Sequence, residues 1–177
     1  KTLCMIKDAE SQFNSCNWGI INKQCDRKTI VIVAPRILLT QQLCEDFVST
    51  LNVHPMLQYK VLHVHSGNTS YDTTTNANRI GNWCDENYRF NKLIFTTYHS
   101  LIRIMQSEIK VDTVYFDEAH NACGKSFSAG VVFFGAYSPR VYFFTATPKH
   151  TTNKYKLGMN NTNIFGEVIC QVPAPEL

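Results

Sequence analysis

Residues 114–120 read Val114-Tyr115-Phe116-Asp117-Glu118-Ala119-His120, an apolar run that ends in two adjacent carboxylates. If the run is a buried strand, Asp117 and Glu118 lie at the edge of a sheet, where active sites commonly form. A site that hydrolyses a nucleotide needs one carboxylate to hold Mg²⁺ and a second to orient or deprotonate the attacking water. Asp117 and Glu118 suit these two roles. Taken alone, the pair also fits a solvated acidic turn after a strand.

Other short apolar runs resemble this one, and they are continuous rather than alternating. Such runs are typical of strands covered on both faces, as in a parallel sheet flanked by helices. They are Ile30–Val33, Val61–Val64, Leu93–Phe95 and Val141–Phe144. Helical patterns lie between them, at Leu3–Cys16, Ile37–Leu51, Thr74–Glu86, His99–Glu108 and Lys125–Ala136. This alternation predicts a doubly wound α/β domain with its ligand site at the carboxyl ends of the strands.

The composition fits one domain of ordinary size. The chain has 177 residues, 44% of them hydrophobic, and a formal charge of +3, which permits a polyanionic partner but does not require one. Its seven cysteines are scattered without metal-ligand spacing, which favours buried free thiols in a reducing compartment. No apolar stretch approaches the ~20 residues that span a bilayer. We therefore expect an intracellular protein without a membrane partner, in the cytoplasm or, for a viral protein, in an infected cell.

Asp117-Glu118-Ala119-His120 also spells the DEAH form of the Walker B motif, and here the chain resembles superfamily 2 helicases. Downstream, Phe143-Phe144-Thr145-Ala146-Thr147-Pro148 is similar to motif III of that family. The resemblance implies a RecA-like P-loop NTPase lobe, mainly a parallel sheet with helices on both faces. It also implies that His120, Thr145 and Thr147 link the nucleotide to the placement of a second lobe. Without the resemblance, the two threonines would be polar caps at a strand end.

Three further segments resemble the parts of the family that contact a nucleic-acid strand. Two follow apolar runs directly: Val33-Ala34-Pro35-Arg36, continued by Leu39-Thr40-Gln41-Gln42, and Phe95-Thr96-Thr97. The third is His65-Ser66-Gly67. The resemblance implies contacts to the phosphate backbone of DNA or RNA, with DNA favoured. The residues concerned are Pro35, Arg36, Thr40, Gln41, Ser66, Gly67, Thr96 and Thr97.

The family also requires a glycine-rich loop that ends in Gly-Lys-Thr or Gly-Lys-Ser, and this chain begins with Lys1-Thr2. The resemblance implies that Lys1 binds phosphate and that Thr2 is a ligand of Mg²⁺. An arbitrary chain start is the alternative interpretation. If the first holds, Lys1 and Thr2 must converge with Asp117, Glu118 and His120 on one pocket for ATP and Mg²⁺.

Two other patterns could indicate a phosphate-binding loop or a metal site. Ala119-His120-Asn121-Ala122-Cys123-Gly124-Lys125-Ser126 nearly matches a phosphate-binding loop, but its first glycine is replaced and two carboxylates precede it. We interpret Gly124-Lys125-Ser126 as a loop and helix start. His63 and His65 share one face of a predicted strand as two metal ligands would, yet the sequence places no third ligand, so core or surface histidines are favoured.

The resulting hypothesis is a single first motor lobe over residues 1–177, beginning inside the phosphate loop and ending at the link to a second RecA-like lobe. It resembles phage, viral and bacterial proteins related to restriction-enzyme motor subunits. The resemblance implies an ATP hydrolase that acts as a helicase or translocase, inactive or weak as an isolated lobe. The alternatives are a nucleic-acid clamp that has lost its ATPase and a P-loop NTPase with another kind of substrate.

Overall fold

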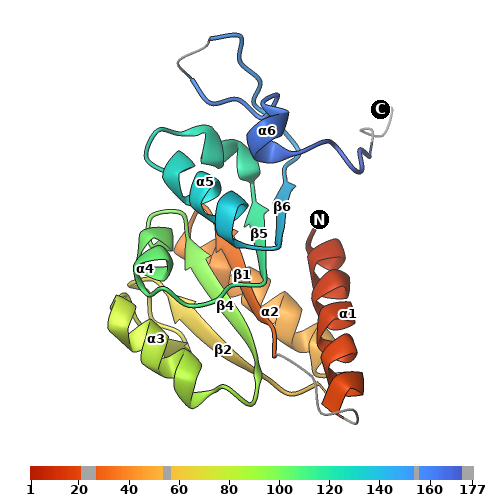
Figure 1. Ribbon diagram of the computed structural model, residues 1–177, viewed down its shortest axis with the longest axis vertical. Helices are drawn as coiled ribbons and strands as arrows, with labels where there is room; N and C mark the ends of the chain where they lie inside the picture. The colour runs from red at the N-terminus through yellow and green to blue at the C-terminus, as the bar shows by residue number, and fades with distance from the viewer. Residues whose placement is uncertain (21–26, 54–56, 154–155, 173–177) are drawn as a thin grey trace.

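The computed structural model describes residues 1–20, 27–53, 57–153 and 156–172, with side chains of 16–20 excluded. Its centre is a six-stranded sheet in which every pairing is parallel, in the order β3-β2-β4-β1-β5-β6 (Figure 1). The strands are β1 Thr29–Ala34, β2 Tyr59–Val64, β3 Asp72–Thr73, β4 Asn91–Thr97, β5 Thr113–Asp117 and β6 Arg140–Phe144. The predicted parallel α/β architecture is confirmed.

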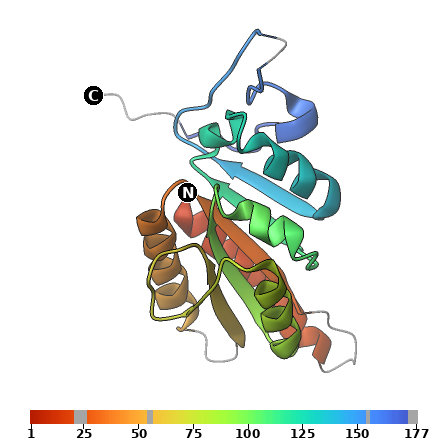
Figure 2. The ribbon, with the colours of Figure 1, turned by 90° about the vertical axis from the view of Figure 1, so that its left-hand side faces the viewer.

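Helices cover both faces of the sheet (Figure 2). The helices α1 Thr2–Ile20 and α2 Ile37–Leu51 pack on one face, and α3 Ala77–Glu86, α4 Leu101–Gln106 and α5 Ser128–Tyr137 pack on the other. The short helix α6 Thr162–Phe165 and the 3₁₀ helix η1 Ala119–Cys123 complete the described elements. Successive residues of β1 point alternately into the two cores, Ile30 and Ile32 into one and Val31 and Val33 into the other. This explains the continuous apolar run.

The predicted boundaries of four helices need correction. α1 runs from Thr2 to Ile20 rather than from Leu3 to Cys16. α3 begins at Ala77 rather than Thr74, because the Thr74 N–H donates to β2 at His63 O and Asn76 caps the helix by accepting from the Arg79 N–H. α4 is shorter than the predicted His99–Glu108. α5 begins at Ser128 rather than Lys125, since residues 125–127 form a turn.

The cysteines agree only in part with the prediction of buried thiols. Cys44 and Cys123 are buried and Cys84 is half-buried, but Cys4 and Cys170 are exposed, so the prediction is wrong for these two. Cys16 and Cys25 lie outside the residues whose side chains are described. Burial raises the pKa of Cys44 to about 12, which leaves that thiol protonated and unreactive near neutral pH.

Candidate functional site

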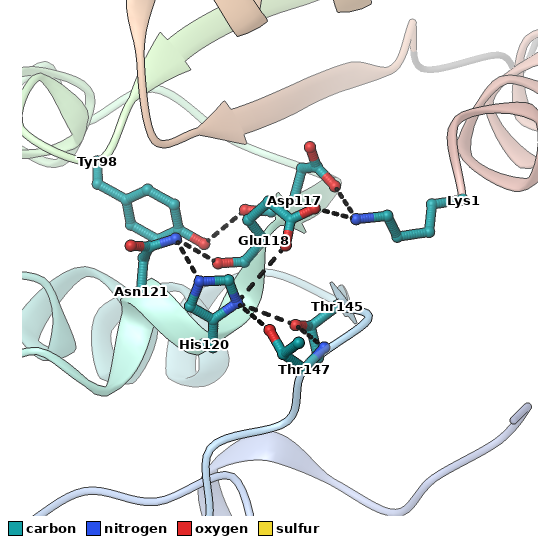
Figure 3. Close-up of polar contacts among 8 residues, drawn as sticks. All are labelled: Lys1, Tyr98, Asp117, Glu118, His120, Asn121, Thr145 and Thr147. Atoms are coloured by element: carbon teal, nitrogen blue, oxygen red, sulfur yellow. Dashed lines mark hydrogen bonds and ion pairs between the residues drawn. The ribbon is translucent and has the colours of Figure 1, made fainter. Parts of the chain in front are cut away.

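The start of the chain and the end of β5 meet at the carboxyl edge of the sheet. Lys1 Nζ lies 3.4 Å from Asp117 Oδ1 and donates a hydrogen bond to Glu118 Oε1 (Figure 3). Asp117 is buried and Glu118 is partly exposed, so Glu118 is the more accessible of the two carboxylates. The structure thus brings together the lysine and the acidic pair that the sequence placed in one pocket.

A buried hydrogen-bond network fixes α1, and with it Lys1, against β5. The Tyr115 hydroxyl donates to Asp8 Oδ2 at 2.5 Å, and Gln12 Nε2 donates to the same carboxylate oxygen at 2.8 Å. The Thr113 hydroxyl donates to Gln12 Oε1 at 2.8 Å. Because each polar group here is satisfied within the core, the helix has a single well-defined position on the sheet. Lys1 therefore reaches the acidic pair from a rigid support.

The backbone at Glu118 turns sharply as β5 ends. Glu118 has φ 46° and ψ 51°, in the left-handed region that side-chain-bearing residues seldom adopt. The turn is held by the Asn121 side chain, whose Nδ2 donates to Glu118 O at 2.8 Å, and by the Tyr98 hydroxyl, which donates to Asp117 O at 3.0 Å. Strained backbone that the surroundings hold in place is typical of functional sites, and here it accompanies the contact of the Glu118 carboxylate with Lys1.

His120 connects this turn to the segment after β6. Its Nδ1 lies 3.1 Å from Thr145 Oγ1 and 3.2 Å from Thr147 Oγ1 (Figure 3). Asn121 Nδ2, which can act only as a hydrogen-bond donor, lies 3.3 Å from His120 Nε2. Nε2 is therefore the acceptor, and Nδ1 carries the proton that is shared with the threonines. The predicted association of His120 with Thr145 and Thr147 is present in the fold.

The electrostatics favour a positive charge at this point. Burial of Lys1 opposes its charge, but the hydrogen bond to Glu118 and the charges of Asp117 and Glu118 outweigh that effect and raise the pKa of Lys1 above its ordinary 10.5. Lys1 is therefore an ammonium at neutral pH. A bound polyanion would have to compete with the acidic pair for it.

The acidic pair has the chemistry of a magnesium site. Mg²⁺ prefers hard oxygen ligands and is commonly bound through one or two carboxylates, with water and substrate phosphates as the remaining ligands. Within the described part of the chain, no group of three or more His, Cys, Asp or Glu side chains could hold a metal by itself. Asp117 and Glu118 therefore fit a cation that arrives with phosphate rather than a closed protein cage. Thr2 is half-buried as the first residue of α1, beside Lys1.

The residues expected to contact a strand lie at the same edge of the sheet, but not all reach the surface. Arg36 is exposed at the N-terminus of α2, Pro35 precedes it half-buried, and Ser66 is exposed after β2. Thr40 and Thr96 are fully buried, and their hydroxyls donate to Ile37 O and Val64 O; Thr97 is buried too. Direct contact of Thr40 or Thr96 with a strand therefore does not fit this structure. Gln41 and Gly67 are half-buried, and Gln41 Nε2 donates to Asn68 O at 2.7 Å.

The family described as "Type III restriction enzyme, res subunit" matches residues 1–150. The chain belongs to this family. Its fold is that of the RecA-like lobe of superfamily 2 helicases, as the motifs predicted. A search of curated proteins gave no match for this res-subunit lobe.

Two solved structures resemble the res-subunit lobe. One is a nuclease-deletion mutant of the Type ISP restriction-modification enzyme LlaGI in complex with a DNA substrate mimic, with TM-score 0.64 and 22% identity over 92% of this chain and 17% of that one. The other is the ATP-dependent Type ISP restriction-modification enzyme LlaBIII bound to DNA, with TM-score 0.57 and 19% identity over 88% and 12%. At these identities the likeness concerns the fold. The chain spans less than a fifth of either protein.

The competing phosphate-loop pattern of the res-subunit lobe is not arranged as such a loop. Ala119, at the position of its first glycine, is fully buried, and the Gly124 N–H donates to Asn121 O at 3.0 Å. A loop that cradles phosphates presents free backbone N–H groups instead.

No described helix is both long and apolar enough to cross a membrane.

Sequence reasoning missed the residues that hold the site together. Asp8 and Gln12 fix α1, while Tyr98 and Asn121 hold the turn at Glu118. Asp8 and Gln12 lie four residues apart on a helix and share one face, and this spacing indicates that they could bind a common partner. Only the fold shows that this face meets β5.

Proposed function

We propose that the protein containing this lobe hydrolyses ATP with Mg²⁺ and uses the energy to move along DNA. The observation that carries the proposal is the meeting of Lys1 with Asp117 and Glu118 across a separation of 117 residues. An ammonium beside two carboxylates at the carboxyl edge of a parallel sheet supplies the groups that phosphoryl transfer from a nucleotide requires. The family match over residues 1–150 supports the same assignment.

Each residue then has a distinct part. Lys1 binds the terminal phosphates, leaving the acidic pair when the polyanion enters. Thr2 and Asp117 would hold the cation, and Glu118 orients the attacking water and takes up its proton. Mg²⁺, when bound, neutralises charge on the phosphate oxygens. Because the Glu118 carboxylate is set by a strained turn with several hydrogen bonds, it needs little rearrangement for this task.

His120 is placed to report the state of the nucleotide. Its Nδ1 lies 3.5 Å from Glu118 Oε2 and within hydrogen-bond distance of both threonine hydroxyls after β6. A change at Glu118 on hydrolysis alters the partner of the imidazole and so the position of Thr145 and Thr147. We propose that a second RecA-like lobe in the full-length protein responds to this shift.

The track runs over the carboxyl ends of β1, β4 and β2. Arg36 and the helix N-terminus beside it meet phosphates, Ser66 and Gly67 provide a further contact, Pro35 forms part of the surface, and Thr97 lies buried beneath it. Gln41 supports the contact loop through Asn68. DNA is favoured over RNA because two of the solved structures that resemble the lobe are described with DNA or a DNA mimic.

The test is ATP turnover by the full-length protein with and without single-stranded DNA at low salt. Turnover should rise when DNA is added, and the binding of DNA should weaken steeply with salt and on Arg36→Ala. Nucleotide binding without turnover would support a clamp that has lost its ATPase. Turnover that no nucleic acid changes would point to an NTPase with another substrate.

A further inference from the structure

A polar pocket of about 320 Å³ lies at the outer edge of the sheet, and two of the predicted contacts, Ser66 and Gly67, form part of its lining. One wall is the loop after β2, with Ser66, Gly67 and Asn68, and the other is the chain from β3 into α3, which includes Thr74, Thr75 and Arg79. Hydroxyl and amide donors predominate, Arg79 supplies a positive charge, and no carboxylate is among the lining residues. This composition suits an anion that accepts several hydrogen bonds.

The first wall is rigid. The Gly67 N–H donates to His65 Nδ1 at 3.0 Å, and Gln41 Nε2 holds the next residue through Asn68 O. A Cβ at Gly67 would lie 2.6 Å from Ile37 Cγ2 and 3.2 Å from His65 Nδ1, so the loop is packed closely against α2 and β2. The pocket is therefore formed before a ligand arrives, and binding does not have to order this wall.

The second wall offers an uncommitted cation. Arg79 is exposed in the first turn of α3, and its guanidinium has no hydrogen-bond or ion-pair partner among the described residues. The nearby carboxylate of Asp72 accepts from Trp83 Nε1 at 2.8 Å instead. Arg79 is thus available to a ligand, while buried Ile80 and Trp83 fix its helix to the core.

The position of the pocket identifies the ligand. Neighbouring strands are ~4.8 Å apart, so the row of strand ends from β1 through β4 and β2 to β3 extends about 14 Å. Arg36 lies at one end of this row, and the pocket, with Ser66 in its wall, lies near the other end. We propose that the pocket holds a backbone phosphate of the same DNA strand, with Arg79 as its charged contact. This inference rests on the proposed function and adds the charged residue Arg79 to the contact already proposed at Ser66 and Gly67.

The experiment measures the affinity of the full-length protein for a labelled 16-nucleotide single strand over a range of salt concentrations. Arg79→Ala should weaken binding about fivefold and lower the salt slope by about one. Arg89→Ala is the matched control, because it removes the same charge near the opposite, amino-terminal edge of β4 and should have no effect. Equal affinity of the Arg79→Ala variant and the wild type would overturn the proposal.

A second arm decides whether the phosphate belongs to the strand. Single linkages of the oligonucleotide are replaced in turn by neutral methylphosphonates, and the loss of affinity is compared between the wild type and Arg79→Ala. One linkage should cost affinity in the wild type and nothing further in the variant. Independent effects at every linkage would mean that the pocket takes a free phosphate ion or nothing. If Arg36→Ala weakens binding while Arg79→Ala does not, only the pocket fails; if neither changes it, the proposed function fails.

Discussion

The buried histidine pair makes the lobe sensitive to acid in a way that one substitution can isolate. His65 Nδ1 accepts from the Gly67 N–H, so its Nε2 carries the proton and donates to His63 Nδ1 at 3.0 Å. The remaining His63 Nε2–H has no hydrogen-bond partner among the described residues. The His63 ring stacks between Tyr71 and Phe95, with centroids 5.9 and 5.5 Å away. A proton added to this pair would be a buried charge without a counter-ion.

The cost follows from the pKa of His63. Burial, and then the neighbouring His65, lower this pKa from 6.5 to about 4. Since the folded pKa is depressed, the unfolded chain binds more protons below pH 6.5, and stability is lost as pH falls from 6.5 towards 4. For these two pKa values, the loss between pH 7 and pH 5 is about 2 kcal/mol. Below pH 4 the contribution is constant.

The perturbation is His63→Asn, whose amide oxygen can accept from His65 Nε2–H while removing the titrating ring. Urea unfolding of the 177-residue chain gives the free energy of unfolding at pH 7 and pH 5 for both proteins. The variant should lose about 2 kcal/mol less than the wild type between these two pH values. An equal loss in both would show that His63 titrates normally and would refute the argument from burial.

Three other substitutions have defined outcomes. Tyr115→Phe removes the hydroxyl that donates to Asp8 and should lower the free energy of unfolding by about 2 kcal/mol, measured by urea unfolding. Gly67→Ala places a Cβ against Ile37 and should cost about 1–3 kcal/mol in the same assay while weakening DNA binding by fluorescence anisotropy. His120→Ala should leave nucleotide binding intact but reduce the stimulation of ATP turnover by DNA; unchanged stimulation would argue against its coupling role.

The sequence predicts the sheet well because β1, β4 and β5 are buried on both faces and therefore appear as unbroken apolar runs. It does not predict β3, since Asp72 and Thr73 are both polar and exposed, so no apolar pattern marks this short strand. η1 is missed for a related reason. Its conformation depends on the left-handed turn at Glu118, and no local propensity marks that turn.

The site is predicted in outline but not in detail. Asp117 and Glu118 could be placed from the strand that precedes them, whereas Lys1 depended on the family resemblance because nothing in its local sequence indicates a pocket. Thr40 and Thr96 could not be recognised as buried, since a strand-end or helix threonine has the same local pattern whether its hydroxyl faces solvent or a backbone carbonyl. Only the packing of α2 and β2 decides whether each hydroxyl faces solvent or a backbone carbonyl.

Replacing Glu118 tests most directly whether ATP is hydrolysed at this site. ATP turnover by the full-length protein, with saturating single-stranded DNA, is compared between the wild type and Glu118→Gln, alongside nucleotide binding. Turnover should fall at least ~100-fold, because the amide cannot take up a proton from the attacking water, while nucleotide still binds through Lys1 and Asp117. Equal turnover in the two proteins would contradict the assignment of this pocket as the site of ATP hydrolysis.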